Sequence, residues 1–288
     1  MTKTQATTLG FGAVLMWALL AFLTVKTVPI APFQLTAMSF AIGGALGLAW
    51  VLLTGEAKSL KTVSWKIYAF GTMGLFGYHF FYFSALRLAP AAEAGLIAYL
   101  WPLLIVLLSS LLPGERLKAG HIIGGLVGFT GATLILTQGG TSFEASAALG
   151  YGLALLCAVT WSSYSVISRS LGQTPTSSVA IFCLATAALS GLAHFIFEDT
   201  LWPFELTTWL AVIGLGVGPV GLAFFVWDVG VKRGDIQLLG VASYAAPLLS
   251  TFVLVMAGIA DLTWDLLSAS VLITIGAVLA ARASRSNN

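Results

Sequence analysis

The chain has 288 residues and a formal net charge of +2; 58% of its residues are hydrophobic and only 8% are charged. A soluble domain carries charge on about a quarter of its residues, so this composition excludes a soluble globular protein. It also gives no basic surface for a nucleic acid partner. Cys157 and Cys183 lie inside apolar runs, which predicts buried thiols and neither a disulfide nor a metal site.

Ten apolar stretches are long enough to cross a hydrocarbon core of about 30 Å. In chain order they cover residues 9–24, 32–53, 66–86, 90–112, 120–138, 149–171, 177–197, 207–230, 236–258 and 265–282. The period-2 alternation of a barrel strand is absent, and a helix satisfies its own backbone in lipid. We therefore expect an all-α integral membrane protein with ten transmembrane helices and little mass outside the bilayer.

The basic residues predict the orientation of these spans. Of the 13 lysines and arginines, all but Lys26 and Arg87 fall on the side that holds both termini. Basic residues are enriched in cytoplasmic loops. The sequence thus predicts a bacterial inner-membrane protein with cytoplasmic N- and C-termini.

The two halves of the chain resemble each other. Gly77 and Phe80 recur 144 residues later as Gly221 and Phe224, and Trp17 recurs as Trp161. We divide the chain at residues 1–143 and 144–288, with five spans in each part. Five is an odd number, so the second repeat must be inverted relative to the first. Inverted repeats are typical of transporters, whose site lies between the repeats near the membrane midplane.

Glycines at helical spacing predict close helix packing. Gly120, Gly124 and Gly128 form such a row on the fifth span. The eighth span differs, because Gly216, Gly218 and Pro219 crowd one turn of it, and that density indicates a loosened helix or hinge.

Three tryptophans are candidates for a substrate site. Trp17, Trp101 and Trp161 fall near the middle of the first, fourth and sixth spans. An indole N–H at that depth needs a partner where there is no water, so these rings face protein or a cavity. Cavity lining and plain core packing both remain open. Trp227, near the end of its span, is expected instead at the headgroup belt.

The third span adds polar aromatic residues. Tyr78, His79 and Tyr82 lie three and four residues apart, so one helix face carries two hydroxyls and an imidazole. An ionisable residue at mid-membrane is a functional hypothesis. The alternative for His79 is a neutral ring that is hydrogen-bonded to a neighbouring helix.

Two prolines at corresponding places predict helix breaks. Tyr99 and Tyr244 each precede an in-helix proline, Pro102 or Pro247, by three residues, and Ser243 lies beside the second break. A proline removes an intrahelical hydrogen bond and frees a carbonyl. Such paired breaks point to a transporter's binding site, so Tyr99, Ser243 and Tyr244 join the candidates.

The positions of the charged residues limit the chemical class of the substrate. No lysine, arginine, aspartate or glutamate falls at mid-depth, which disfavours phosphate-bearing substrates and proton-coupled export of cations. Asp228 lies four residues before Lys232 and is expected to form an interfacial ion pair with it. The composition of the candidate site suits a neutral or zwitterionic apolar solute. Coupling to an ion has no evident carrier except His79, so facilitated diffusion or exchange is the default.

No motif predicts catalysis. His79, His121 and His194 lie on separate spans, and there is neither a nucleotide-binding glycine loop nor a pair of intramembrane aspartates. We therefore expect no enzyme activity, no cofactor and no metal.

The pattern of Pro102, Gly114-Glu115, Gly124 and Gly131, on ten short spans in two halves, resembles the EamA-type group of the drug/metabolite transporter superfamily. The second half departs from it, since Ala260-Asp261 stands where a glutamate would match Glu115. Finer motifs are similar to the aromatic amino-acid exporter branch. They are Tyr99-Leu-Trp-Pro102, Trp161-Ser-Ser-Tyr164, Trp227-Asp-Val-Gly230 and Ser243-Tyr244-Ala-Ala-Pro247.

The resemblance implies export of amino acids, aromatic ones included, through a central cavity to which Tyr164 would also contribute. His79 is not part of the recognised motifs. The alternatives are efflux of lipophilic drugs or other small metabolites, and a non-transporting structural or scramblase-like protein. The expected partners are an amino acid and the lipid bilayer; the sequence leaves the oligomeric state open.

Overall fold

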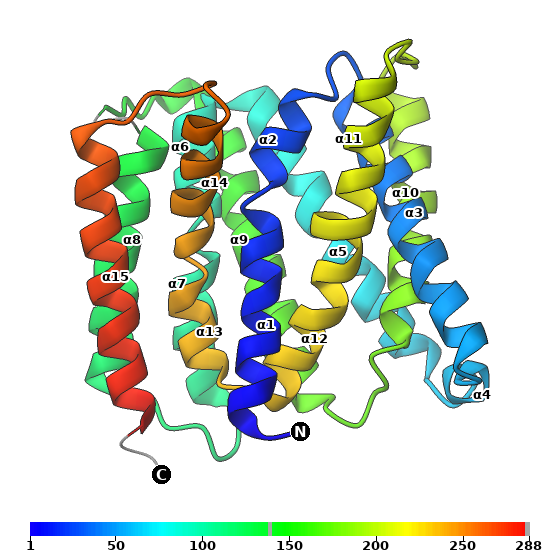
Figure 1. The fold of residues 1–288 in the computed structure, drawn as a ribbon, viewed down its shortest axis with the longest axis horizontal. Coiled ribbons are helices and arrows are strands. Elements are labelled where there is room, and N and C mark those ends of the chain that lie inside the picture. The colour runs from blue at the N-terminus through cyan, green and yellow to red at the C-terminus, as the bar shows by residue number, and fades with distance from the viewer. Residues whose placement is uncertain (138–139, 286–288) are drawn as a thin grey trace.

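The computed structural model describes residues 1–137 and 140–285, and within these ranges the chain is helical without any β-strand. Long helices stand side by side in one bundle (Figure 1). Both termini lie at the same end of the bundle, which we call the N/C end; the opposite end is called the far end.

The first half of the chain contains α1 (Lys3–Trp17) followed by α2 (Leu20–Val25), α3 (Pro32–Leu53), the short α4 (Ala57–Leu60), α5 (Trp65–Leu88), α6 (Ala91–Ala98) followed by α7 (Trp101–Leu108), and α8 (Ala119–Thr137). The second half contains α9 (Ala148–Ser170), α10 (Ser178–Phe197), α11 (Leu206–Val217) followed by α12 (Ala223–Arg233), α13 (Ile236–Ala242) followed by α14 (Ala245–Met256), and α15 (Trp264–Arg285).

Nine helical segments of the described chain are long and apolar enough to cross a membrane. The remaining long helix, α5, has 24 residues and does not reach the same apolarity. Its sequence includes Tyr78, His79 and Tyr82, which lower its mean hydropathy. The predicted spans agree with the helices to within a few residues, except that the first begins at Lys3 and not at residue 9. Gln138, the last residue of the predicted fifth span, lies outside the described residues.

The most extensive helix contacts are α8 with α15, α3 with α10, α5 with α9 and α1 with α12. Glycines permit this closeness. A Cβ on Gly124 would lie 2.6 Å from the carbonyl oxygen of Gly276, and one on Gly10 would lie 2.7 Å from Cα of Gly230. These backbones therefore touch directly, as the glycine row on the fifth span predicts.

Four of the helical segments are interrupted. The first bends at Ala18–Leu19, α6 and α7 meet at Tyr99–Leu100, and α13 and α14 meet at Ser243–Tyr244. The last two interruptions come just before Pro102 and Pro247. Between α11 and α12 the chain makes a π-helical turn at Gly218–Leu222, where the glycine-rich sequence indicates a loosened helix. A Cβ on Gly221 there would overlap the carbonyl oxygen of Gly216.

Candidate substrate-binding site

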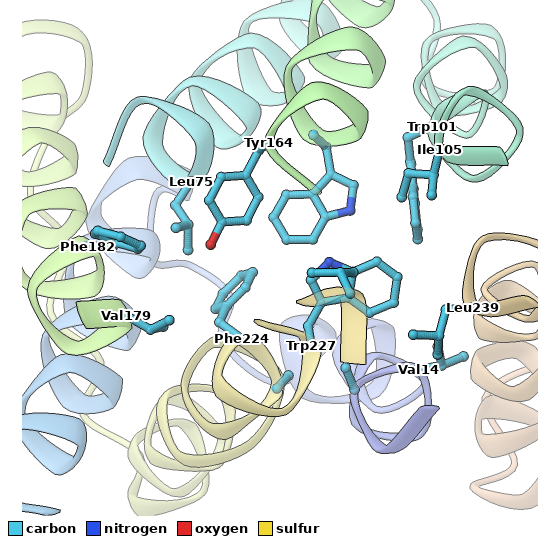
Figure 2. Packing of buried hydrophobic residues seen from close by; sticks show 14 of the residues in the cluster. Val14, Leu75, Trp101, Ile105, Tyr164, Val179, Phe182, Phe224, Trp227 and Leu239 are labelled. Carbon is cyan, nitrogen blue, oxygen red and sulfur yellow. The ribbon is translucent and has the colours of Figure 1, made fainter. Parts of the chain in front are cut away.

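Four tryptophans meet at the centre of the bundle, which we call the tryptophan cluster. Trp17, Trp101, Trp161 and Trp227 come from α1, α7, α9 and α12, and every pair of rings has centroids between 5.1 and 6.3 Å apart. Figure 2 shows Trp101, Tyr164, Phe224 and Trp227 converging on one space. Both halves of the chain contribute two of the indoles, so the cluster lies between the halves.

Two of the indole N–H groups have hydrogen-bond partners. Nε1 of Trp17 donates to the carbonyl oxygen of Pro219 at 3.1 Å, and Nε1 of Trp227 donates to Oγ of Ser165 at 3.1 Å. The Pro219 carbonyl belongs to the π-helical turn. The irregular backbone of the eighth segment thus provides an acceptor for a tryptophan of the first half.

Tyrosines form one edge of the cluster. Tyr78 and Tyr82 stack with their rings 3° from parallel, and Tyr78 lies 5.6 Å from Trp161. Tyr99 lies 6.3 Å from Trp101. The three tyrosines are half-buried, whereas Trp227 is fully buried. Because α5 runs from the N/C end to the far end (Figure 1), Tyr82 marks the far-end side of the cluster.

His79 lies on the same helix but bonds to its own backbone. Nδ1 is 2.8 Å from the carbonyl oxygen of Leu75, one turn earlier. A carbonyl only accepts, so Nδ1 carries the proton. The ring packs edge-on against Phe40 at 5.0 Å and lies 5.1 Å from Tyr78. The alternative to a functional role for His79 was a hydrogen bond to a neighbouring helix. The structure instead shows a hydrogen bond within α5 itself.

Tyr164 continues the aromatic stack toward α5. Its ring lies 5.3 Å from Trp161 and 5.7 Å from Phe70, in stacked geometry with both. A groove of about 440 Å³ between α5 and α9 is lined by Gly74, Thr160 and Tyr164, among others. The ring of Tyr164 is therefore shared by the cluster and this groove.

Ser243 and Tyr244 lie away from the tryptophan cluster. Tyr244 belongs to a separate cluster with Ala132 and Ile273, and its ring packs on Phe129. Its hydroxyl accepts a hydrogen bond from the backbone N–H of Leu103 at 3.1 Å. Oγ of Ser243 donates to the carbonyl oxygen of Leu239 at 2.7 Å. The structure thus gives both residues local partners at the helix breaks, and their predicted role in binding stays a prediction.

The sequence-based placement of Trp227 at the headgroup belt is wrong. The side chain is 0% exposed and contacts the other three tryptophans. The error arose because the distance of a residue from the end of its span does not show whether its side chain faces lipid or the interior of the bundle. Phe224 was also missed as a site residue, although the repeat had singled it out. One helical turn separates it from Trp227, which is the signal that could have identified both.

Charged residues gather at the N/C end. The predicted Asp228–Lys232 ion pair is present, with Nζ 2.9 Å from the carboxylate, and at 2% and 5% exposure both side chains are buried within the protein. Arg169 pairs with Glu115 and donates to the carbonyl oxygens of Val231 and Gly234 at 2.8 and 2.9 Å. These bonds tie α9 to the end of α12.

The far end has its own ion pair. Glu198 accepts hydrogen bonds from the backbone N–H groups of Phe33 and Gln34 at the start of α3 and pairs with Arg87 at 2.8 Å. A carboxylate at a helix N-terminus satisfies unpaired N–H groups and the helix dipole. Glu198 therefore has an evident structural role, which is to cap the start of α3.

Two stretches of the chain, residues 5–137 and 148–282, match the sequence profile described as the EamA-like transporter family. The chain belongs to the EamA-like transporter family. Within it, the chain is 53% identical over 287 residues to a protein named aromatic amino acid exporter YddG from Ancylobacter novellus, covering 99% of this chain and 100% of that one. A second relative of the same name, from Salmonella typhimurium, is 24% identical and also matches 99% of both chains.

A further relative is named for a different substrate. A biotin transporter of Escherichia coli is 25% identical over 208 residues, which is 70% of this chain and 69% of that protein. Among solved structures, one crystal structure is 53% identical, covers 99% of both chains and superposes with a TM-score of 0.94. The fold of this EamA-like transporter is therefore that of a known structure. Within the described residues, no three His, Cys, Asp or Glu side chains gather to hold a metal ion.

Proposed function

We propose that the chain exports amino acids, with aromatic side chains among its substrates, across the bacterial inner membrane. The observation that carries the proposal is the tryptophan cluster at the junction of the two halves. Indole and phenol rings offer stacking area to an aromatic side chain, and their faces attract an ammonium group. The 53% identity to a protein named an aromatic amino acid exporter supports the same substrate class.

The proposed topology has ten transmembrane helices, with α5 as the tenth, in two inverted repeats at residues 1–143 and 144–288. The two family matches support two repeats. The helix contacts support the symmetry. If each segment of one half is exchanged for its counterpart, the α3–α10 and α8–α15 contacts map onto themselves, and α5–α9 maps onto α1–α12.

The charge distribution supports a cytoplasmic N/C end. Of the 13 lysines and arginines only Lys26 and Arg87 lie at the far end, and the positive-inside rule places the opposite end in the cytoplasm. In the conformation described, the N/C side of the cluster is fully buried at Trp227 and the far side is half-buried at Tyr82. Transport would alternate this closure between the two ends by rocking one repeat against the other.

In this mechanism Trp17, Trp101, Trp161 and Trp227 hold the aromatic side chain, and the hydroxyls of Tyr78, Tyr82 and Tyr99 meet its polar groups. No charged side chain touches these rings in the described contacts, which favours facilitated diffusion or exchange. His79 is the candidate proton carrier among the described residues beside these rings. If a proton is coupled, His79 carries it, and His79→Gln would abolish flux driven by a pH gradient.

The experiment is counterflow in liposomes that contain only this protein. Liposomes preloaded with unlabelled phenylalanine should accumulate labelled phenylalanine, tyrosine and tryptophan transiently, and labelled glutamate or lysine much less. Trp161→Ala should abolish the overshoot, while Trp202→Ala, at a side chain that is 58% exposed, should leave it intact. Flat traces for every amino acid with folded protein would overturn the proposal. Flux of a lipophilic cation under those conditions would indicate drug efflux instead.

A further inference from the structure

The ion pair Asp228–Lys232, which we call the charge pair, is buried although neither side chain caps a helix. Two ion pairs of the described chain have both side chains nearly inaccessible, at 5% and 2% exposure each: His194–Glu198 and the charge pair. Glu198 caps the start of α3. The charge pair caps no helix start: its atoms bond across to the segment that precedes α10. Because burying two opposite charges is no better for stability than packing apolar side chains, an ion pair kept at this depth is a functional hypothesis.

The hydrogen bonds of the charge pair connect two segments of the chain, and a ligand with both charges can replace them. Nζ of Lys232 lies 2.9 Å from the Asp228 carboxylate and donates to the carbonyl oxygen of Thr174 at 2.9 Å. Oγ1 of Thr176 donates to Asp228 at 2.7 Å. These bonds join α12 to the connection between α9 and α10 at the N/C end. A ligand that satisfied both charges would therefore release that connection.

The charge pair also lies close to the aromatic side chains that contact the tryptophan cluster. A small, partly open pocket of about 10 Å³ touches Asp228, Lys232, Ser168 and Phe70. Such a volume holds no more than one water. Phe70 stacks on Tyr164, which stacks on Trp161. A continuous row of stacked rings thus connects the surroundings of the charge pair with the tryptophan cluster.

We propose that the charge pair is the entry subsite for the zwitterionic part of an amino acid arriving from the cytoplasm. The proposal rests on the proposed function, because it names where that substrate's charged groups bind. In the conformation open to the N/C end, Asp228 accepts the substrate ammonium and Lys232 donates to the substrate carboxylate. Each charge stays paired throughout, so the exchange leaves no bare charge in a place without water.

The repeat indicates that this subsite exists at one end only. Arg87 stands 145 residues before Lys232, in the corresponding place on α5. However, Arg87 is 44% exposed, and its partner Glu198 is held by the start of α3. Among the described residues, the counterpart of the charge pair at the far end is therefore a partly exposed arginine whose carboxylate partner already caps a helix. The asymmetry suits a transporter that loads its substrate from the cytoplasm.

The test compares three solutes at each face of the membrane. Inverted membrane vesicles present the N/C end and right-side-out vesicles present the far end. The solutes are phenylalanine, 3-phenylpropionate, which lacks the ammonium, and phenethylamine, which lacks the carboxylate. The wild-type chain should prefer phenylalanine to both analogues at the N/C end.

Each single variant should lose one preference. Asp228→Asn should raise the KM for phenylalanine at the N/C end about 10-fold, as for the loss of one charge-assisted hydrogen bond, and should no longer disfavour 3-phenylpropionate. Lys232→Gln should raise the KM similarly and no longer disfavour phenethylamine. At the far end the KM for phenylalanine should differ from the wild-type value by no more than about twofold, because substrate that enters there does not bind at the charge pair first. Arg87→Gln is the matched control and should leave the N/C-end ranking of the three solutes unchanged.

A double variant, Asp228→Leu with Lys232→Leu, separates binding from folding. Buried pairs tolerate such replacement without loss of stability, so this variant should melt near the wild-type temperature yet lose both preferences. Wild-type KM and ranking in the folded double variant would overturn the subsite while leaving amino-acid export standing. Absence of phenylalanine flux in the wild-type chain would overturn the proposed function, and the subsite with it.

Discussion

The two ends of the bundle hold their helices together in different ways. At the N/C end, Arg169 and Lys232 reach from one segment to backbone oxygens of another, and Lys232 is almost completely buried. At the far end, Arg87 is 44% exposed and pairs with a carboxylate that already caps a helix. An inverted repeat alone would make the ends equivalent. The difference teaches that buried polar bonds between helical segments hold the N/C end together in this conformation, whereas the arginine of the far-end pair is partly exposed.

The largest effect on stability should come from removing the buried polar bonds of Arg169. Arg169→Gln removes the partner of Glu115 and two bonds to α12, and it leaves a mostly buried carboxylate unpaired. We expect a loss of about 3 kcal/mol in unfolding free energy, measured by denaturant unfolding in detergent. Arg87→Gln at the far end should cost at most about 1 kcal/mol, because Arg87 is partly exposed and the buried Glu198 keeps the N–H groups of Phe33 and Gln34 as partners. Equal losses would show that the two ends are held equally.

Tyr244 and Tyr82 provide a second comparison, between a buried tyrosine at a helix break and one at the edge of the tryptophan cluster. Tyr244→Phe removes the acceptor for the Leu103 N–H, and we expect a loss of about 1 to 3 kcal/mol in stability with no change in the KM for phenylalanine. A changed KM with unchanged stability would instead return Tyr244 to the binding site. Thermal melting and counterflow on the same preparation separate these outcomes.

Tyr82→Phe should give the opposite result. Its hydroxyl lies at the half-buried far-end side of the cluster, so its loss should leave the melting temperature unchanged. The KM for phenylalanine at the far end should rise about 3- to 10-fold, as for one hydrogen bond. A fall in stability without a KM change would place Tyr82 in the packing of α5 and not in the site.

These comparisons also mark how far the sequence could predict the structure. Helix positions followed from apolar length, because lipid demands helices of nearly fixed length. Trp17, Trp101 and Trp161 were proposed from their depth, and the repeat supported Trp17 and Trp161. Trp227 was not proposed, because its position near the end of its span does not show which side of α12 its ring occupies. The crowded glycines predict a loosened helix but not the π-helical turn at Gly218–Leu222.

Tyr244 illustrates a different limit. Its position before Pro247 indicates a helix break, but the sequence does not say on which side of the helix the ring lies. Only the packing of Phe129 and Gly128 against it decides that its hydroxyl bonds to Leu103. Likewise, the spacing of Asp228 and Lys232 predicts their ion pair, whereas its burial depends on the segment before α10.

The smallest effect concerns Asp235, between α12 and α13. Burial by itself would raise the pKa of this carboxyl, but the N–H of Leu238 and the Lys3 ammonium outweigh burial and hold the pKa below its ordinary value of 3.8. A depressed pKa adds stability above 3.8 that is lost as the pH falls through the folded-state value. Asp235→Asn should therefore cost about 0.3 to 1 kcal/mol at pH 7. The difference from the wild-type chain should vanish in acid; a difference that persists there would contradict a charge effect.

The central claim of the proposed function is that the tryptophan cluster binds substrate. In this conformation the substrate would reach it from the far end, where Tyr82 is half-buried, and not from the N/C end, where Trp227 is fully buried. Labelling with a membrane-impermeant thiol reagent tests it most directly, in a chain whose buried Cys157 and Cys183 are replaced by alanine. In the Tyr82→Cys variant, the new thiol should react quickly with reagent added on the far side and much more slowly with reagent added on the N/C side. Phenylalanine should protect it from the reagent. Equal reactivity from both sides, or no protection by any aromatic amino acid, would contradict the account.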